Sequence, residues 1–417
     1  PIDPDGKSIY NPRINPIGNY LTYLATKSPT NKGTIVPHYV TESGYTEDED
    51  TRSKVGNNPY EYEMFVYDIA NKKAYPKDGS VSLLDHQHDE AWIAGPGIGG
   101  YEGGDKGWMP DGKSIWFQSE KTGYSHLYVI DLTTKQTKPL TSGQFEIYDP
   151  RISKDKKRWY FTANKNHPGD KQFYSMPIVG GIMEQLTHMT GSNEVTLSPD
   201  ERKMAILHSY TNKPTELYLQ DNPIWGKSKA EAKRITYSTT KDFDGYQWRD
   251  PQIITFKAED GEAVHARLYK PSSDVKNKAA IIFVHGAGYL QNAHKWWSTY
   301  FREYMFHNLL VDNGYTVLDI DYRGSAGYGR DWRTGIYRHM GGKDLSDHVD
   351  GAKYLIDELG IDQDKIGIYG GSYGGFITLM AMFKAPDTFK AGAAIRSVGD
   401  WAAYNHGYTA RILNTPV

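Results

Sequence analysis

Alternating apolar and polar residues dominate the first part of the chain. Three segments, which begin at Met109, Ser153 and Ser198, each pair a polar turn with two alternating strands. Their turn residues Asp111, Asp155 and Asp200 recur about every 45 residues, and each unit closes on a similar short strand. A period of about 40–50 residues with several short strands per repeat is typical of β-propeller blades. We therefore predict a β-propeller.

One more blade is predicted near the start of the chain. Its strands follow Asn15 and Tyr62, and a polar, acidic insertion over residues 41–58 separates them. We interpret the insertion as a solvated loop rather than a metal site. This gives a partial propeller of about four blades, and since propellers usually close with more, further blades are expected on the N-terminal side.

The pattern changes near residue 245. A hairpin with an Asp260–Gly261 turn comes first. Apolar strands then alternate with helices, over residues 279–284, 315–322, 344–360, 365–369 and 391–398. This alternation predicts a mostly parallel α/β sheet. We predict two domains, a partial propeller over 1–245 and an α/β-hydrolase domain over 246–417.

Composition narrows the class of protein without identifying it. The chain of 417 residues has 38% hydrophobic and 24% charged residues and a formal net charge of -3. Nothing in this balance favours nucleic acid or an anionic membrane as a partner, and no apolar run has the ~20 residues that a membrane span needs. Cysteine is absent, which excludes disulfides and thiolate metal sites. No metal or cofactor is expected.

The segment IGIYGGSYGGFITLM (Ile366–Met380) carries the clearest chemical signal. It places Ser372 among glycines between an apolar strand and an apolar helical stripe. This fits G-x-S-x-G, the nucleophile elbow, in which the serine hydroxyl stands exposed on a strained turn. A glycine-rich corner with an idle serine is the alternative interpretation.

A second loop is the candidate oxyanion hole. His285, Gly286 and Ala287 follow a buried strand, where α/β-hydrolases place one oxyanion donor. The other donor is the N–H after the nucleophile, which belongs here to Tyr373. An ordinary strand-end turn would explain the same glycines.

An aromatic segment follows the strand that ends near Ile395. Trp401, Tyr404 and Tyr408 recur at three and four residues, so we predict one helical face that carries all three rings. Two interpretations stay open, a helix packed on the core and the wall of a pocket for a flat apolar ring such as proline.

Two further motifs are interpreted as structural. GPGIGG (Gly95–Gly100) satisfies G-x-G-x-x-G, but no helical pattern follows it, so dinucleotide binding is not predicted. DHQHDE (Asp85–Glu90) is interpreted as a polar segment between blades rather than a metal site.

Taken together, GGSYGG, DYRGSAGYG and DWAAYNHGYTAR resemble the prolyl oligopeptidase family of serine peptidases, nearest its dipeptidyl peptidase IV branch. The resemblance implies that Ser372 is the nucleophile and that Arg411 lies near the substrate. It also implies a pocket for a proline-like ring, lined by Val398, Trp401, Tyr404 and Tyr408 with Tyr373. Short peptides are the implied substrates, the resemblance favours a periplasmic or extracellular location, and it allows a homodimer.

The sequence also departs from that branch. His285 stands where dipeptidyl peptidase IV has a tyrosine, and the chain has no Glu-Glu pair to bind a free amine. An acylaminoacyl peptidase or esterase, or a propeller-based binding protein without catalysis, therefore remains an alternative.

The expected order of the catalytic triad is Ser, then Asp or Glu, then His. After Ser372 the only acids are Asp387 and Asp400, and the only histidine is His406. The chain also starts and stops in mid-pattern. We therefore expect a piece of a longer protein whose triad Asp and His lie beyond Val417, and residues 1–417 alone are expected to be inactive.

Overall fold

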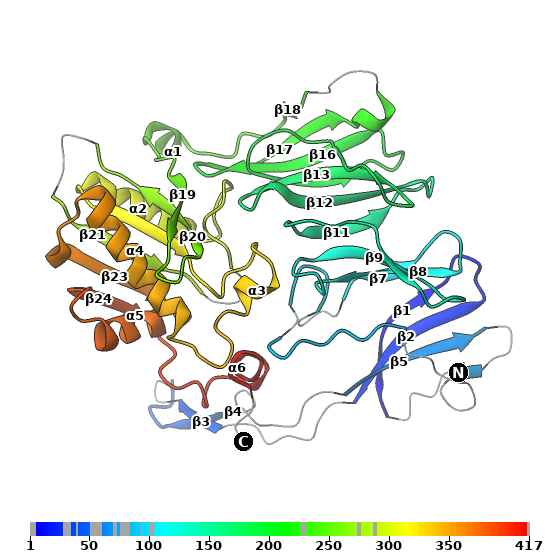
Figure 1. Cartoon of the computed structure of the whole chain (residues 1–417), viewed down its shortest axis with the longest axis horizontal. Helices are drawn as coiled ribbons and strands as arrows, with labels where there is room; N and C mark the ends of the chain where they lie inside the picture. Colours follow the sequence, from blue (N-terminus) through cyan, green and yellow to red (C-terminus); the bar gives the residue numbers. More distant parts are fainter. Residues whose placement is uncertain are drawn as a thin grey trace.

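The computed structural model describes residues 6–27, 35–38, 41–50, 61–69, 73–75, 84–92, 94–99, 104–226, 231–272, 277–286 and 290–414. Two bodies are visible in Figure 1, a set of mostly antiparallel sheets (blue to green) and an α/β body (light green to red).

Four units of four antiparallel strands form the first body, and the third and fourth units are joined into one eight-stranded sheet by a parallel pairing of β13 with β15. The first unit has β1 (Ser8–Ile14), β2 (Tyr20–Lys27), β5 (Glu61–Asp68) and β6 (Lys73–Tyr75), and the second has β7 (Lys106–Trp108), β8 (Ser114–Ser119), β9 (His126–Asp131) and β10 (Thr137–Pro139). The third has β11 (Ile147–Ile152), β12 (Arg158–His167), β13 (Asp170–Pro177) and β14 (Glu184–Gln185). The fourth has β15 (Ser192–Leu197), β16 (Lys203–Tyr210), β17 (Lys213–Asp221) and β18 (Lys233–Arg234). These are the predicted propeller blades.

The first strands of two blades share nearly the same sequence and the same distortion. β1 contains IYNPRI and β11 contains IYDPRI. In each, the residue before proline has a φ of 49° (Asn11 and Asp149), and the pairing register shifts there. Asn and Asp tolerate this left-handed conformation better than most residues, so both strands bulge at the same point. The repeat predicted from the sequence thus extends to backbone detail.

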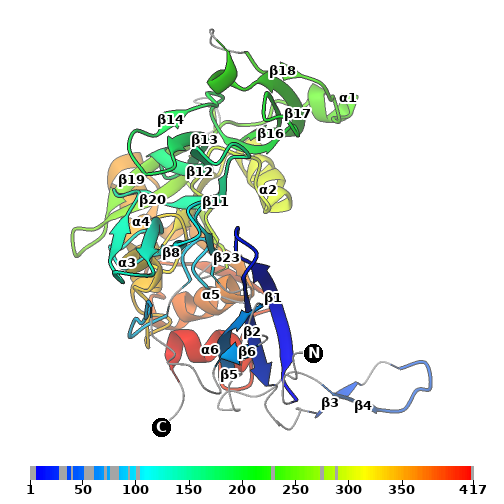
Figure 2. The ribbon, with the colours of Figure 1, turned by 90° about the vertical axis from the view of Figure 1, so that its right-hand side faces the viewer.

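The prediction of a loop over residues 41–58 needs correction. β3 (Ile35–His38) pairs antiparallel with β4 (Glu47–Asp50), so the insertion contains one strand of a hairpin whose other strand precedes it, and residues 51–60 lie outside the described part of the chain. In Figure 2 the hairpin extends away from the blade. The charged sequence of β4 has no apolar alternation, and backbone pairing with β3 gives it extended structure nevertheless.

The second body contains one six-stranded sheet in the order β19-β20-β22-β21-β23-β24. Pairing is parallel from β22 through β21 and β23 to β24 and antiparallel between β19, β20 and β22. The strands are β19 (Gln252–Lys257), β20 (Ala263–Tyr269), β21 (Ala280–Val284), β22 (Thr316–Asp321), β23 (Ile366–Gly371) and β24 (Ala391–Ile395). The chain is therefore a propeller followed by an α/β-hydrolase fold, as predicted.

Helices cover both faces of this sheet. The longer helices of this body are α2 (Phe301–Asp312), α4 (Lys343–Leu359), α5 (Tyr373–Lys384) and α6 (His406–Leu413), and the shorter ones are α3 (Arg330–Arg333) and η2 (Gln363–Lys365). Two other short helices lie outside it, η1 (Pro223–Trp225) in the fourth blade and α1 (Lys241–Gly245) between the two bodies. Leu318 packs in one core with α4 and α5, whereas its neighbour Val317 packs in another with α2. Because successive strand residues point to opposite faces, α2 lies on the face opposite α4 and α5.

The predicted domain boundary at 245/246 falls between β18 and β19, directly after α1. Contacts nevertheless connect the two bodies. Arg333 donates to Glu120 at 2.7 Å, and their side chains are only 3% and 4% exposed. The boundary itself stays a prediction.

Candidate active site

Ser372 occupies the turn between β23 and α5. Its backbone has φ 58° and ψ -116°, a conformation that a residue with a side chain rarely adopts. Its main-chain N–H donates to the carbonyl of Ile395 at 3.0 Å, which ties the turn to β24. The predicted strand, turn and helix are all present, and the strain has the form that a nucleophile elbow requires.

Two glycines make this turn possible. A Cβ atom at Gly374 would lie 2.0 Å from the carbonyl oxygen of Val284, and one at Gly370 would lie 2.5 Å from the same oxygen. Any larger residue would push α5 away from β21. The glycines therefore bring the N-terminus of α5 against the end of β21, where the candidate oxyanion loop begins.

Tyr373 begins α5, and its side chain is buried and held from two sides. Its hydroxyl donates to the carboxyl group of Asp344, and its ring stacks on Tyr322 with 6.2 Å between ring centroids. Asp344 also accepts the N–H groups of Gly341 at 3.0 Å and Leu345 at 2.9 Å. Burial raises the pKa of Asp344 to about 6.

The side chain of His285 is buried rather than open to a substrate. Its Nε2 lies 3.2 Å from Asp321 and 3.1 Å from the Ser325 hydroxyl, and its carbonyl oxygen accepts the Tyr322 hydroxyl at 2.7 Å. Burial alone would lower the pKa of His285, but the hydrogen bond and the charge of Asp321 outweigh it and raise the pKa. The imidazole is thus part of the support of the loop.

Only the first part of the candidate oxyanion loop can be described. The N–H of Gly286 donates to the Tyr300 hydroxyl at 3.1 Å, and the ring of Tyr300 packs edge-on against Phe283. Ala287 and Gly288 lie outside the described residues. The oxyanion role of His285, Gly286, Ala287 and Tyr373 stays a prediction.

The three aromatic residues after β24 do come together, although not on one helix. Trp401 stacks on Tyr408 at 5.8 Å and meets Tyr404 edge-on at 5.6 Å, and Tyr373 joins the cluster at 5.4 Å from Trp401. The prediction of one helical face is wrong, because α6 begins only at His406, where the Asn405 side chain accepts the N–H of Tyr408. The Asn N-cap is the sequence signal that marks this start.

Val398 and Arg411 flank this aromatic cluster in the sequence. Val398 is buried after β24, and Arg411 lies in the last turn of α6, one helical turn after Tyr408. Because Tyr373 contacts Trp401 and directly follows Ser372, the aromatic cluster lies next to the elbow. Whether these residues bind a substrate stays a prediction.

Within the described residues, no histidine or carboxyl group forms a hydrogen bond with the Ser372 side chain. Asp400 is exposed, and its carboxylate caps the N–H of Ala402 at 2.9 Å. His406 begins α6, and Asp387 lies between α5 and β24. The structure therefore assembles the elbow and the aromatic cluster, but no triad around them.

The two motifs interpreted as structural contain none of the predicted site residues. After GPGIGG the next element is β7, a strand. Asp85–Asp89 line a small pocket with Glu120 and Arg330, and the described residues contain no group of three or more side chains that could hold a metal ion. None of the helices in the described ranges is long and apolar enough to cross a membrane.

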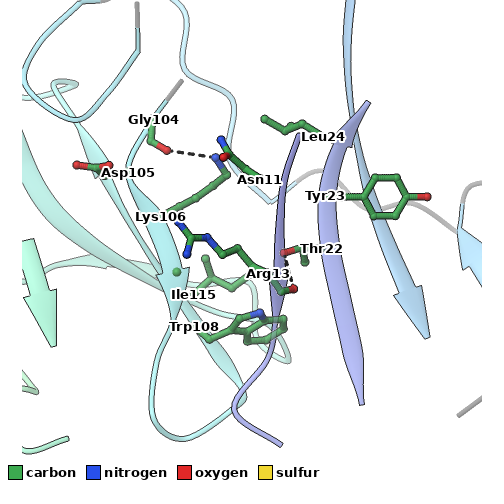
Figure 3. Close-up of a pocket in the computed structure, with 11 residues that line it drawn as sticks. Asn11, Arg13, Thr22, Tyr23, Leu24, Gly104, Asp105, Lys106, Trp108 and Ile115 are labelled. Atoms are coloured by element: carbon green, nitrogen blue, oxygen red, sulfur yellow. Dashed lines mark hydrogen bonds between the residues drawn. The ribbon is translucent and has the colours of Figure 1, made fainter. Parts of the chain in front are cut away.

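Another small pocket, of about 120 Å³, lies between the first two blades (Figure 3). Arg13 on β1 and Lys106 on β7 face it, and the Lys106 ammonium donates to the carbonyl of Gly104 at 3.2 Å. This pocket belongs to the blade seam and contains none of the predicted site residues.

Sequence reasoning missed the buried charges that support the elbow and its loop. Asp319, Asp321, Asp344 and Arg267 are each at most 2% exposed. A charged residue at the end of an apolar strand, as in VLDID, is the signal that could have identified the two aspartates of β22.

Comparisons with known proteins agree with the fold. The family model described as "Prolyl oligopeptidase family" matches residues 300–417, and the one described as "Dipeptidyl peptidase IV (DPP IV) N-terminal region" matches residues 86–215. Both domains of one peptidase architecture are thus represented in their usual order. The two matches and the curated relatives support a dipeptidyl peptidase IV-like member of the prolyl oligopeptidase family.

Individual relatives are longer than this chain. Dipeptidyl peptidase 8 of Mus musculus is 28% identical over 338 residues, which cover 72% of the chain and 37% of the relative. Dipeptidyl peptidase 4 of Trichophyton equinum is 26% identical over 306 residues, 71% of the chain and 39% of the relative. The crystal structure of Porphyromonas gingivalis dipeptidyl peptidase 4 superposes with a TM-score of 0.74 at 19% identity, covering 97% of the chain and 62% of that structure. The chain thus spans well under half the length of the two sequence relatives.

Proposed function

We propose that the complete protein is a serine peptidase that cleaves short peptides through an acyl-enzyme. The observation that carries the proposal is the strained turn at Ser372, which presents a serine at the N-terminus of α5 beside the end of β21. In this mechanism the Ser372 hydroxyl attacks the scissile carbonyl, and the Tyr373 N–H with the loop that begins at His285 stabilises the oxyanion. Water then hydrolyses the acyl-enzyme.

The base and its acid are expected outside residues 1–417. Asp400 is exposed and engaged in a local cap, so it offers no support to a base at Ser372. A serine without a base is a weak nucleophile at neutral pH. The proposal therefore refers to the full-length protein, and Asp400 with His406 becomes the pair to test if residues 1–417 alone hydrolyse peptides.

A fluorophosphonate probe tests the chemistry directly. In the full-length protein we expect stoichiometric labelling, located by peptide mapping at Ser372, and no labelling of Ser372→Ala. A folded full-length protein that does not label would show that the propeller-based binding protein is the correct interpretation. Thermal melts of both proteins establish that the variant is folded.

The aromatic cluster gives a prediction about substrate choice. Tyr404 and Tyr408 present edge-to-face rings 5.6 Å apart, and Trp401 lies against Tyr408. We expect chromogenic substrates with Pro or Ala before the scissile bond to be cleaved faster than those with Lys or Glu. Tyr408→Ala should lower kcat/KM about tenfold, because losing a packed aromatic contact costs on the order of 1–3 kcal/mol. A preference for Lys would contradict this pocket.

An acylaminoacyl peptidase or esterase is the second candidate. Two observations favour it, His285 in place of the branch's tyrosine and the absence of a Glu-Glu pair from the sequence. Cleavage of one peptide with a free and with an acetylated N-terminus separates the two functions. Faster cleavage of the acetylated form would support the second candidate.

A further inference from the structure

The segment Leu290–Trp297 follows the candidate oxyanion loop and lies between the two domains. From its contacts we infer that the β12–β13 turn of the propeller, through Gly169, is a positioning element for acyl transfer. The turn fixes the main chain of Leu290–Trp297 and, through Asp321, the side chain of His285, the residue at which the candidate oxyanion loop begins. This inference rests on the proposed acyl-transfer function.

Buried charges hold the segment from the side of the α/β sheet. The Asp321 carboxylate, at the end of β22, accepts the N–H groups of Asn292 at 2.7 Å and Ala293 at 2.9 Å. Arg267 on β20 donates from Nε to the carbonyl of His294 at 3.0 Å. All five residues are at most 2% exposed, so water does not compete for these hydrogen bonds.

The propeller holds the same segment from the other side. The carbonyl of Gly169 accepts the N–H of Lys295 at 2.8 Å, and the carbonyl of Pro168 accepts the Gln291 side chain at 3.1 Å. In the next blade, the Ser209 hydroxyl accepts the N–H of Trp297 at 3.3 Å. The main chain is thus bonded to the α/β domain at residues 292–294 and to the propeller at Lys295 and Trp297.

Gly169 packs so closely against the main chain of the segment that a side chain at this position would not fit. A Cβ atom there would lie 2.7 Å from both the Ala293 carbonyl oxygen and the His294 Cα. These are main-chain atoms, so they could move away only if the segment itself moved. On the same hairpin, the Lys171 ammonium lies 5.0 Å from the centre of the Trp296 ring. The turn therefore sets the position of residues 293–296.

Asp321 connects this position to the oxyanion loop. The same carboxylate that accepts Asn292 and Ala293 lies 3.2 Å from Nε2 of His285. A shift of Leu290–Trp297 would therefore change the hydrogen bonding of His285. Because catalysis depends on sub-ångström placement of oxyanion donors, the effect should appear in the acylation step rather than in substrate binding.

The test compares two glycine-to-alanine variants of the full-length protein. Gly169→Ala adds a methyl group against the segment, whereas Gly226→Ala adds one in the same propeller where nothing lies within 4 Å. We expect Gly169→Ala to lower kcat at least about tenfold with KM within about twofold of the parent. Gly226→Ala should leave both values unchanged.

Inhibitors separate positioning from a general loss of structure. A peptide aldehyde places an oxyanion in the hole, whereas the matching peptide alcohol does not, so Gly169→Ala should weaken the aldehyde and spare the alcohol. A variant that melts earlier but keeps the parent kcat and aldehyde affinity would overturn the inference. If Gly169→Ala does not fold, Gln291→Ala decides in the same assay, because it removes the bond to Pro168 together with a hydrogen bond to Tyr328, which donates to Asp321 at 2.6 Å, and should shift kcat in the same direction by a smaller factor. Parental kcat in Gln291→Ala would then overturn the inference.

Different experimental results would contradict the inference and the proposed function. If Ser372→Ala retains turnover, the proposed function is wrong whatever Gly169→Ala does. If Ser372→Ala is inactive and Gly169→Ala behaves like the parent in kcat and aldehyde affinity, only the positioning role is wrong.

Discussion

Tyr373 links the candidate oxyanion donor to a buried carboxyl group. Its N–H belongs to the first turn of α5, while its hydroxyl bonds to Asp344 at the start of α4. Asp344 is fully buried, and burial raises its pKa to about 6. Between the usual value near 4 and this value, the folded protein binds a proton that the unfolded chain releases.

This shift predicts a pH-dependent contribution to stability. Because the folded pKa is raised, the contribution of Asp344 is fully present below pH 4 and is lost as pH rises through about 6. Asp344→Asn cannot titrate, so it does not lose this contribution. The free energy of unfolding of the variant minus that of the parent should therefore be on the order of 2 kcal/mol larger at pH 7 than at pH 4. Urea denaturation across that range gives the difference, and parallel pH profiles would contradict the prediction.

At the scale of elements, β24 ends the sheet with an open edge. All five of its residues are exposed, and Ile395 is 50% exposed. Beside it lies an apolar groove of about 480 Å³, bounded by α2, β23 and β24. Among the described strands β24 pairs only with β23, and a strand with one free edge next to apolar surface favours pairing with another copy of the chain.

We therefore expect residues 1–417, expressed alone, to associate and to show no burst of acyl-enzyme with an activated ester. Ala393→Lys places a charge on the exposed edge and should reduce association, which sedimentation velocity measures. A version extended by roughly one hundred residues is expected to be soluble and active, if those residues supply further strands and the triad partners. A monomeric, active chain of 417 residues would contradict this expectation.

Features of these elements that depend on neighbouring residues could be predicted from the sequence, whereas contacts between distant residues could not. The elbow followed from glycine spacing around Ser372, and the end of α4 from Gly360, which adopts the left-handed conformation expected of a helix C-cap. The bond between Tyr373 and Asp344 could not be predicted, because it joins residues that only the folded sheet brings together. The β3–β4 hairpin was missed because its pairing, rather than its composition, makes it extended.

At the scale of the whole molecule, a buried ion pair crosses between the domains. Arg333 of α3 donates to Glu120, which follows β8, and Glu120 also accepts the N–H of Ala94 at 3.3 Å. An ion pair removed from water costs desolvation, so its loss on one side leaves a buried charge without compensation.

We expect Arg333→Met to lower the free energy of unfolding by about 3–5 kcal/mol and to expose the chain between β18 and β19 to proteolysis. The double variant Glu120→Gln, Arg333→Met should be more stable than the sum of the single changes implies, since neither charge remains. Denaturation of the four proteins forms the cycle. Additive effects would show that the pair does not couple the domains.

The first blade has a further consequence for engineering. β2 and β5 pair in register from Tyr20 with Asp68 to Lys27 with Glu61, so the chain leaves the blade and returns to it at adjacent positions. The two ends of the segment between Lys27 and Glu61 are therefore neighbours in the sheet. This position is therefore a site for insertion: an affinity tag, an epitope or a fluorescent protein with closely spaced ends is expected to replace the intervening residues without changing the register of either strand.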